Sequence, residues 1–185
     1  MTHATRYSPH ILVVLVSLVG CATQLAATPQ SSIDTQADPE LAARFPSRVA
    51  GEAFPVETFR DEATLRRMGV DASFLEALAV DFEDVSVALG HRPMATATSI
   101  HLSTYAYRVR GVTEDRLAKY FIPVMEAQSE DLPLERTSVR GKEVWRPSGL
   151  AVAVAGNMLY VRGDTAYLIY GDRRDVADLL VAALP

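Results

Sequence analysis

The sequence predicts an α+β fold: a single domain on a mainly antiparallel sheet, with helices packed on one face. Two observations lead to this class. Short apolar segments come in pairs separated by tight turns, which is typical of antiparallel hairpins. Amphipathic segments with capping residues stand between these groups instead of following every strand. The region from Glu40 to Pro185 is also long enough to bury a core without a disulfide.

The first expected elements are short. Glu40–Ala43 predicts a helical turn, and Ala53–Phe59 predicts a strand at a sheet edge, because Pro55 lacks the amide hydrogen that a central strand needs. Two short helices are expected over Asp61–Met68 and Asp71–Val80, the second with its first residue as N-cap.

A strand pair and the longest helix follow. The expected strands, Asp84–Gly90 and Thr96–Arg110, are joined by a turn through Arg92-Pro93. The helix Glu114–Gln128 has Thr113 as its N-cap and acids in its first turn, where the helix dipole favours negative charge. Its apolar residues recur at helical spacing and predict one core-facing stripe: Leu117, Tyr120, Phe121, Val124 and Met125.

Two hairpins and a last helix complete the expected fold. The paired strands are Glu135–Val139 with Lys142–Arg146, and Asn157–Val161 with Ala166–Tyr170. A further short strand is expected over 151–155, between the two hairpins. Asp172 is expected to cap the last helix. The apolar stripe of that helix is Val176, Leu179, Leu180 and Ala183.

The second hairpin is apolar at nearly every position. With Gly163-Asp164 as a two-residue turn, Tyr160 faces Tyr167 on one side of the sheet and Leu159 faces Leu168 on the other. A sheet covered on one face alone would alternate apolar and polar residues here. Something must therefore cover the second face: more of the same chain, an apolar cleft with its ligand, or an oligomer contact.

Composition narrows the classes of function. The chain has 18 basic and 23 acidic side chains, and its basic residues are dispersed among acids, so no basic stripe exists to bind nucleic acid. The single cysteine excludes an intramolecular disulfide and a zinc site built on several thiolates. The nucleophile-elbow, Walker and dinucleotide-binding motifs are all absent, and no cofactor is expected.

The N-terminal segment carries the most specific motif. Ile11–Gly20 is an unbroken run of apolar or small residues, and a helix of that length rises only ~15 Å, about half the hydrocarbon thickness of a bilayer. It is therefore typical of a secretory signal. The run ends in Leu18-Val19-Gly20-Cys21, which contains the only cysteine of the chain. This tetrapeptide resembles the lipobox of bacterial lipoproteins.

The resemblance implies an anchored protein. Cys21 would carry a diacylglycerol group and become the first residue after cleavage, and two acyl chains hold a protein durably on a membrane. The expected organisation is a signal peptide over 1–20, a flexible tether over 21–39 and a globular domain over 40–185, on the extracytoplasmic face of the cell membrane. The alternatives are an ordinary cleaved signal peptide with an incidental cysteine, or an uncleaved anchor running through Leu25. The globular region is similar to extracytoplasmic lipoprotein domains of uncharacterised role.

Aromatic residues on the expected strands are the candidate ligand contacts. Tyrosine in a strand ordinarily means core or interface packing, whereas tyrosines gathered in a cleft stack on sugars or lipids. The wider aromatic set also contains Phe121, Trp145 and Tyr170, and the candidate ligand contacts within it are Tyr105, Tyr107, Tyr160 and Tyr167.

Other motifs are weaker. His91 and His101 lie off register on two strands, so we expect no metal site there, even with Asp84 nearby. Acids cluster over 81–84 and again at Glu130-Asp131, as solvated loop residues or as an acid–base pair. No residue is assigned a catalytic role. One further run, Arg162-Gly163-Asp164, spells an adhesion tripeptide, but a hairpin turn already explains its Gly-Asp step.

These observations predict an envelope lipoprotein whose domain binds a partner protein, a cell-wall component or a small apolar ligand. The alternatives are an envelope hydrolase that uses paired carboxylates and a structural or accessory subunit. A binding domain should show a closed-ended apolar cleft lined by tyrosines. A hydrolase should show two buried carboxylates within ~10 Å across a groove, and an accessory subunit a flat exposed apolar patch above ~600 Å².

Overall fold

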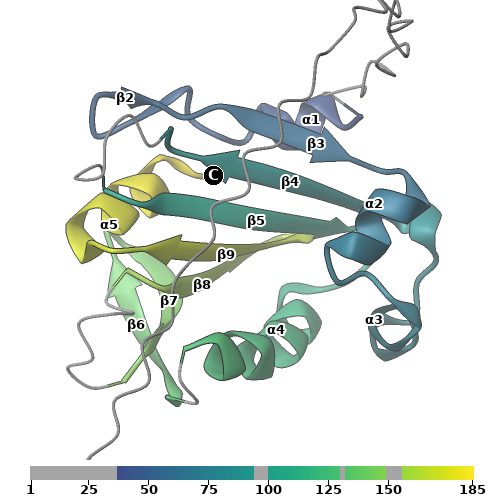
Figure 1. Ribbon diagram of the computed structural model, residues 1–185. Coiled ribbons are helices and arrows are strands. Elements are labelled where there is room, and N and C mark those ends of the chain that lie inside the picture. Colours follow the sequence, from purple (N-terminus) through teal and green to yellow (C-terminus); the bar gives the residue numbers. More distant parts are fainter. Residues whose placement is uncertain (1–36, 94–99, 130–131, 149–155) are drawn as a thin grey trace, which may run out of the picture. The chain divides into compact units, whose positions relative to one another are not determined.

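The structure is a computed structural model that describes residues 37–93, 100–129, 132–148 and 156–185. Within these residues, seven antiparallel strands form one sheet in the order β3-β4-β5-β9-β8-β7-β6, and β1 pairs with β2 in a separate ribbon (Figure 1). The large sheet contains β3 (Val56–Phe59), β4 (Val85–His91), β5 (Leu102–Val109), β6 (Leu134–Val139), β7 (Lys142–Pro147), β8 (Met158–Arg162) and β9 (Thr165–Gly171). The ribbon is β1 (Arg48–Val49) with β2 (Glu52–Ala53). The helices are α1 (Pro39–Ala42), α2 (Glu62–Arg67), α3 (Ala72–Leu78), α4 (Glu114–Gln128) and α5 (Arg174–Ala183), with a 3-10 turn η1 (Phe82–Asp84). The predicted class, a single α+β domain with an antiparallel sheet, is confirmed.

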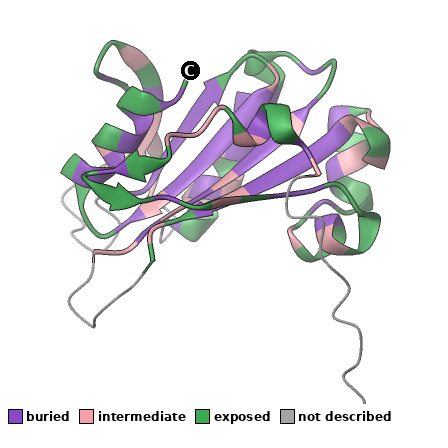
Figure 2. Ribbon diagram, turned by 90° about the horizontal axis from the view of Figure 1, so that it is seen from above, coloured by how far each residue is buried: buried purple, intermediate pink, exposed green. Residues whose placement is uncertain are grey.

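Helices cover both faces of the sheet, which corrects the expectation that they pack on one face. The helices α2, α3 and α4 bury apolar residues against one face, whereas α1 and α5 do so against the other. The reason lies in β8 and β9, which carry apolar residues on both faces, so each face needs its own cover. Figure 2 shows the central strands buried and the outward surfaces of the helices exposed. The cover that the second hairpin requires therefore comes from the same chain.

Both hairpins form as predicted. In the second, Tyr160 pairs with Tyr167 and Leu159 with Leu168. The turn between β6 and β7 contains Arg140 and Gly141 at φ 53° and 83°, the left-handed backbone that a tight two-residue hairpin turn favours. The strand expected over 151–155 and the first residues of the strand expected over 96–110 lie outside the described residues.

The short elements near the start of the domain follow their capping signals. Asp61 and Asp71 accept hydrogen bonds from backbone N–H groups in the first turns of α2 and α3, at 2.9 and 3.0 Å. Pro55 directly precedes β3, which is an edge strand. Thr113 occupies the N-cap position of α4, although its hydroxyl makes no capping hydrogen bond.

The last helix differs from the prediction in its cap and in its buried face. Arg173 is its N-cap residue, and Asp172 instead accepts a hydrogen bond from the N–H of His101 at 3.0 Å. The buried residues are Val176, Ala177, Leu180 and Val181, whereas Leu179 is 41% exposed. The buried face includes the small side chain of Ala177, which lies close to Gly171 of β9, a contact that a pattern of large apolar residues does not reveal.

The folded domain begins earlier than position 40. Asp38 is only 3% exposed, and its carboxylate accepts hydrogen bonds from the N–H of Leu41 at 2.9 Å and the hydroxyl of Ser86 at 2.5 Å. Its own N–H donates to Thr58, and the guanidinium of Arg108 lies 3.4 Å from the carboxylate. Asp38 and the following proline, in the range expected as a tether, therefore belong to the domain. Two apolar clusters supply the core of the described residues, which begin at position 37, so a chain starting at Ser32 should fold alone.

The buried Asp38 makes the stability of the domain depend on pH. Burial disfavours its charged form, but the hydrogen bonds from Ser86 and Leu41, together with Arg108, outweigh burial and lower its pKa. Stability from such a group is present above the ordinary value of ~3.9 and is lost as pH falls through the lower, folded-state pKa. We expect Asp38→Asn to lower the free energy of unfolding by about 2 kcal/mol at pH 7.

Thermal unfolding followed by circular dichroism at pH 7 and pH 3 measures this effect. The variant should melt roughly 5 °C below wild type at pH 7, with the gap narrowing at pH 3. A gap that is equal at both pH values would contradict the assigned role of the carboxylate.

Candidate functional site

A cleft lined by aromatic rings lies on the face of the sheet that α4 covers. Its volume is about 430 Å³. Six rings line it: Phe74, Tyr105, Tyr107, Tyr120, Phe121 and Tyr170. These rings come from β5, β9, α3 and α4, so the cleft is built from elements that are distant in the sequence. We refer to it as the aromatic cleft.

Strand alternation and helical spacing bring the rings together. Tyr105 and Tyr107 lie two residues apart on β5 and therefore point to the same face of the sheet. On α4, Phe121 is buried in the core, whereas Tyr120 and Val124 are half-buried and line the cleft. One flank of the predicted apolar stripe of α4 thus forms a cleft wall.

The turn between α2 and α3 closes one end of the cleft. Gly69 has a φ of 88° in this turn, a backbone conformation that glycine adopts without strain. The hydroxyl of Tyr107 donates a hydrogen bond to the carbonyl of Met68 at 2.6 Å. This bond ties the turn to the sheet and fixes the ring of Tyr107.

The rings hold one another in favourable geometry. The centroids of Tyr107 and Phe121 lie 4.9 Å apart, and Phe74 meets Tyr120 edge to face at 5.1 Å. At the other end of the cleft, Tyr105 meets Tyr170 edge to face at 6.2 Å. All three distances lie in the range at which aromatic pairs attract. The walls are therefore largely preformed before any ligand binds.

The phenol groups of Tyr107 and Tyr170 are neutral at physiological pH. Burial, with a smaller effect of the neighbouring Tyr105, raises the pKa of Tyr107 to about 12, and burial also raises the pKa of Tyr170. The hydroxyl of Tyr170 donates to the side-chain oxygen of Gln128. The cleft thus offers ring faces and neutral hydroxyls, which suit binding better than proton abstraction.

The sheet divides the predicted tyrosine set in two, which corrects the idea of a single site. Tyr105 and Tyr107 line the aromatic cleft, whereas Tyr160 and Tyr167 lie on the opposite face, where their rings stack at 5.6 Å. Register explains the split, because Tyr167 pairs with Ala106 of β5, so both share a face that Tyr105 and Tyr107 do not. Tyr167 is fully buried as a core residue.

Four cleft rings were not in the predicted set, namely Phe74, Tyr120, Phe121 and Tyr170. The edge-to-face contact of Tyr170 with Tyr105 depends on the pairing of β5 with β9, in which Tyr170 lies opposite Ser103. That pairing joins strands separated by more than fifty residues, and no local pattern specifies it. The sequence did place Phe121 and Tyr170 in the wider aromatic set, and Tyr120 in the apolar stripe of the helix Glu114–Gln128.

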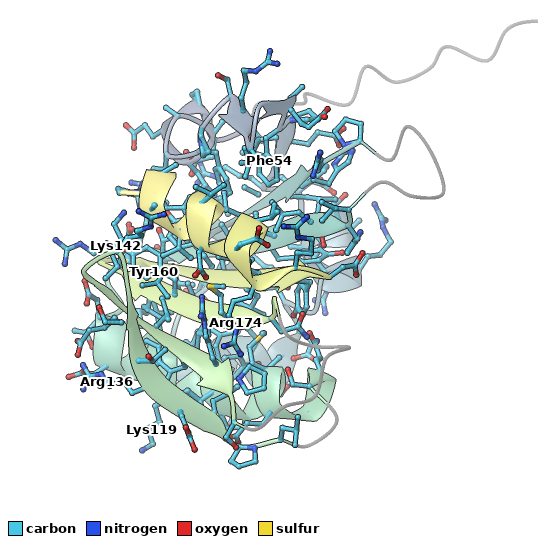
Figure 3. All side chains as sticks on the ribbon, turned by 90° about the vertical axis from the view of Figure 1, so that its left-hand side faces the viewer. Phe54, Lys119, Arg136, Lys142, Tyr160 and Arg174 are labelled. Atoms are coloured by element: carbon cyan, nitrogen blue, oxygen red, sulfur yellow. The ribbon has the colours of Figure 1, made fainter. Side chains whose placement is uncertain are left out.

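A second cavity, of about 400 Å³, lies where β7 and β8 separate. Among the described residues, Trp145 with Leu159 is the only pair that joins these strands in the ladder. Tyr160 lines this cavity beside Lys142, whose ammonium lies 5.6 Å from the centroid of the tyrosine ring (Figure 3).

The charges of the second cavity are largely engaged within the protein. The ammonium of Lys142 donates to carbonyls at the C-terminal end of α5, including that of Val181 at 3.1 Å. Arg136 pairs with Glu143 at 2.5 Å. The aromatic cleft is therefore the better candidate for a ligand site.

The acidic candidates have structural partners. The carboxylate of Asp84 accepts from the N–H of Asp81 and closes the turn η1. Asp38 is the one buried carboxylate among the described residues, so no two such groups face each other across a groove there. The pair Glu130-Asp131 lies outside the described residues.

The two histidines and the tripeptide Arg162-Gly163-Asp164 have structural surroundings that do not form a functional site. Nε2 of His101 lies 3.2 Å from the hydroxyl of Ser103, and His91 is exposed at the end of β4. No group of three metal-ligating side chains occurs in the part of the chain that the structure describes. Asp164 accepts from Arg44 at 2.9 Å and from Arg108 at 3.0 Å, so its carboxylate is held against the protein and is not presented at a loop tip.

Comparison with known proteins finds no relative of this chain. No protein-family model matches the sequence, and neither a curated protein nor a solved structure matches it significantly. Of the described helices, none combines the length and apolar character needed to cross a bilayer. Cys21 lies outside the described residues. The inference about function therefore rests on the N-terminal motif and on the aromatic cleft.

Proposed function

We propose that this protein is a lipoprotein of the cell envelope, anchored through Cys21, and that its domain binds a small apolar ligand in the aromatic cleft. The motif Leu18-Val19-Gly20-Cys21 supports the anchor. The single observation that supports ligand binding is the gathering of four tyrosine and two phenylalanine rings around one cleft.

The size and lining of the cleft suit a small molecule. A volume of about 430 Å³ lies within the usual range of ligand sites, which are mostly apolar with a few polar groups for orientation. Burying about 200 Å² of apolar ligand surface would contribute roughly 5 kcal/mol before the cost of association. Aromatic rings of this kind stack on flat apolar bodies and on the apolar faces of sugars.

Other roles receive less support from the described residues. A hydrolase with paired carboxylates would need a second buried acid, and Asp38 is the one found among them. An accessory subunit would present a broad apolar patch, and Leu179 is the only large apolar side chain exposed in that part of the chain. We therefore place ligand binding first.

Filling the cleft tests the proposal. Val124 lies half-buried on α4 and lines the cleft, so the indole of Val124→Trp should occupy the ligand space. We expect the variant to bind the neutral fluorescent probe N-phenyl-1-naphthylamine at least about tenfold more weakly than wild type. The measurement is a fluorescence titration with the chain that starts at Ser32, free of detergent.

The matched control is Lys119→Trp. It adds the same indole to α4, but at an exposed position that points away from the sheet (Figure 3). This control should bind the probe as wild type does, and both variants should keep the wild-type circular dichroism spectrum. Equal binding by wild type and Val124→Trp would overturn the proposed site.

A further inference from the structure

The charge that lines the aromatic cleft is positive. Arg67, at the end of α2, is the only charged side chain among the described residues that line it. The chain as a whole has the opposite balance, with 23 acidic and 18 basic side chains. A cleft with one cation and no anion, in an acidic protein, is complementary to a negatively charged ligand.

The guanidinium of Arg67 makes few interactions with other described residues. It donates one hydrogen bond, to the hydroxyl of Thr64 at 2.8 Å, and it forms no ion pair with a described carboxylate. Its neighbour Arg66 differs, because it pairs with Glu62 at 2.6 Å and lies over the ring of Phe82 at 4.8 Å. Of two adjacent arginines, the one at the cleft is thus left free to bind.

The carboxylates at the N-caps of α2 and α3 have partners of their own. Asp61 interacts electrostatically with Arg67, but its carboxylate is held by the N–H of Thr64 as the N-cap of α2. Asp71, the N-cap of α3, accepts from Ser73 and from the N–H of Phe74. Both acids therefore already have backbone donors as partners.

We infer that the ligand of the aromatic cleft is a small organic anion, with a flat apolar body between the rings and a carboxylate, sulfonate or phosphate group at Arg67. This inference rests on the proposed function of the cleft. A guanidinium presents several N–H donors in one plane, which matches the oxygen atoms of such groups. Gln128, the one amide side chain among the described residues that line the cleft, already accepts from Tyr170.

Two probes that differ only by a sulfonate test the inference. 8-Anilino-1-naphthalenesulfonate carries the same rings as the neutral N-phenyl-1-naphthylamine. We expect wild type to bind the sulfonate about tenfold more tightly than the neutral probe. Arg67→Gln should remove this preference, so that the two probes bind the variant with similar affinity. Arg48→Gln, the same substitution at an exposed arginine of β1, should leave both affinities at their wild-type values.

Competition identifies the anionic group and separates the two proposals. Displacement of the sulfonate probe by 2-naphthoate or by 2-naphthyl phosphate, better than by neutral 2-naphthol, supports the inference and shows which anion binds. Equal displacement by all three, or a charge preference that survives in Arg67→Gln, overturns it while the proposed site stands. If Val124→Trp binds both probes as wild type does, the proposed function itself fails.

Discussion

Replacing Cys21 by alanine is expected to abolish fatty-acid labelling of the protein and to remove it from the membrane fraction. In the proposed lipoprotein, the lipobox-like motif would make this sulfur the attachment point of the acyl chains. Each buried methylene contributes about 0.8 kcal/mol, so two chains hold the protein durably and their loss releases it. Metabolic labelling with a fatty-acid analogue, followed by fractionation, measures both effects.

The same experiment separates the alternatives for the N-terminal segment. Thr23→Ala, two residues away, is the control and should label as wild type does. If the segment were an ordinary cleaved signal peptide, wild type itself would carry no label. If it were an uncleaved anchor, the cysteine variant would remain in the membrane, and either result would contradict the lipoprotein proposal.

Gly156→Ala is expected to destabilise the domain strongly, although it adds only one methyl group. A Cβ at this position would lie 2.3 Å from the carbonyl oxygen of Gly171, a backbone atom of β9. The N–H of Gly156 donates to that same oxygen at 3.1 Å, and Gly171 packs against Leu102 of β5. The atom in the way belongs to the backbone and cannot rotate aside as the end of a flexible side chain can, so we expect the free energy of unfolding to fall by about 3 kcal/mol and the melting temperature by roughly 10 °C.

Gly111→Ala is the matched control for this substitution. Gly111 has a φ of 77°, and a Cβ there would meet nothing within 4 Å. It therefore reports the cost of left-handed backbone alone, about 1 kcal/mol. Thermal unfolding of both variants separates the two effects. If Gly156→Ala melts no lower than Gly111→Ala, Gly156 does not lie as close to β9 as the structure places it.

Local signals in the sequence predicted the local parts of the fold. The helix Glu114–Gln128 has the predicted bounds, and the register of the second hairpin follows from its two-residue turn. Both features depend on residues close in the sequence, where spacing, caps and turn residues act directly. The burial of Asp38 was not predictable in this way, because its partners Ser86 and Arg108 lie far along the chain.

The candidate site shows the same limit. Strand alternation placed Tyr105 and Tyr107 together, but only the pairing of β5 with β9 separates them from Tyr160 and Tyr167. Tyr120 fitted the apolar stripe of α4, and spacing alone cannot distinguish a residue at the rim of a stripe from one in the core. The cleft thus arises from the tertiary packing of segments whose apolar residues the sequence pattern assigns to the core.

The most direct test of ligand binding in the aromatic cleft is a two-dimensional NMR titration of the chain that starts at Ser32 with 8-anilino-1-naphthalenesulfonate. We predict that the largest shifts fall on Tyr105, Val124 and Tyr170, which line the cleft. Shifts centred instead on Trp145 and Lys142 at the second cavity, with the cleft unchanged, would contradict the proposal.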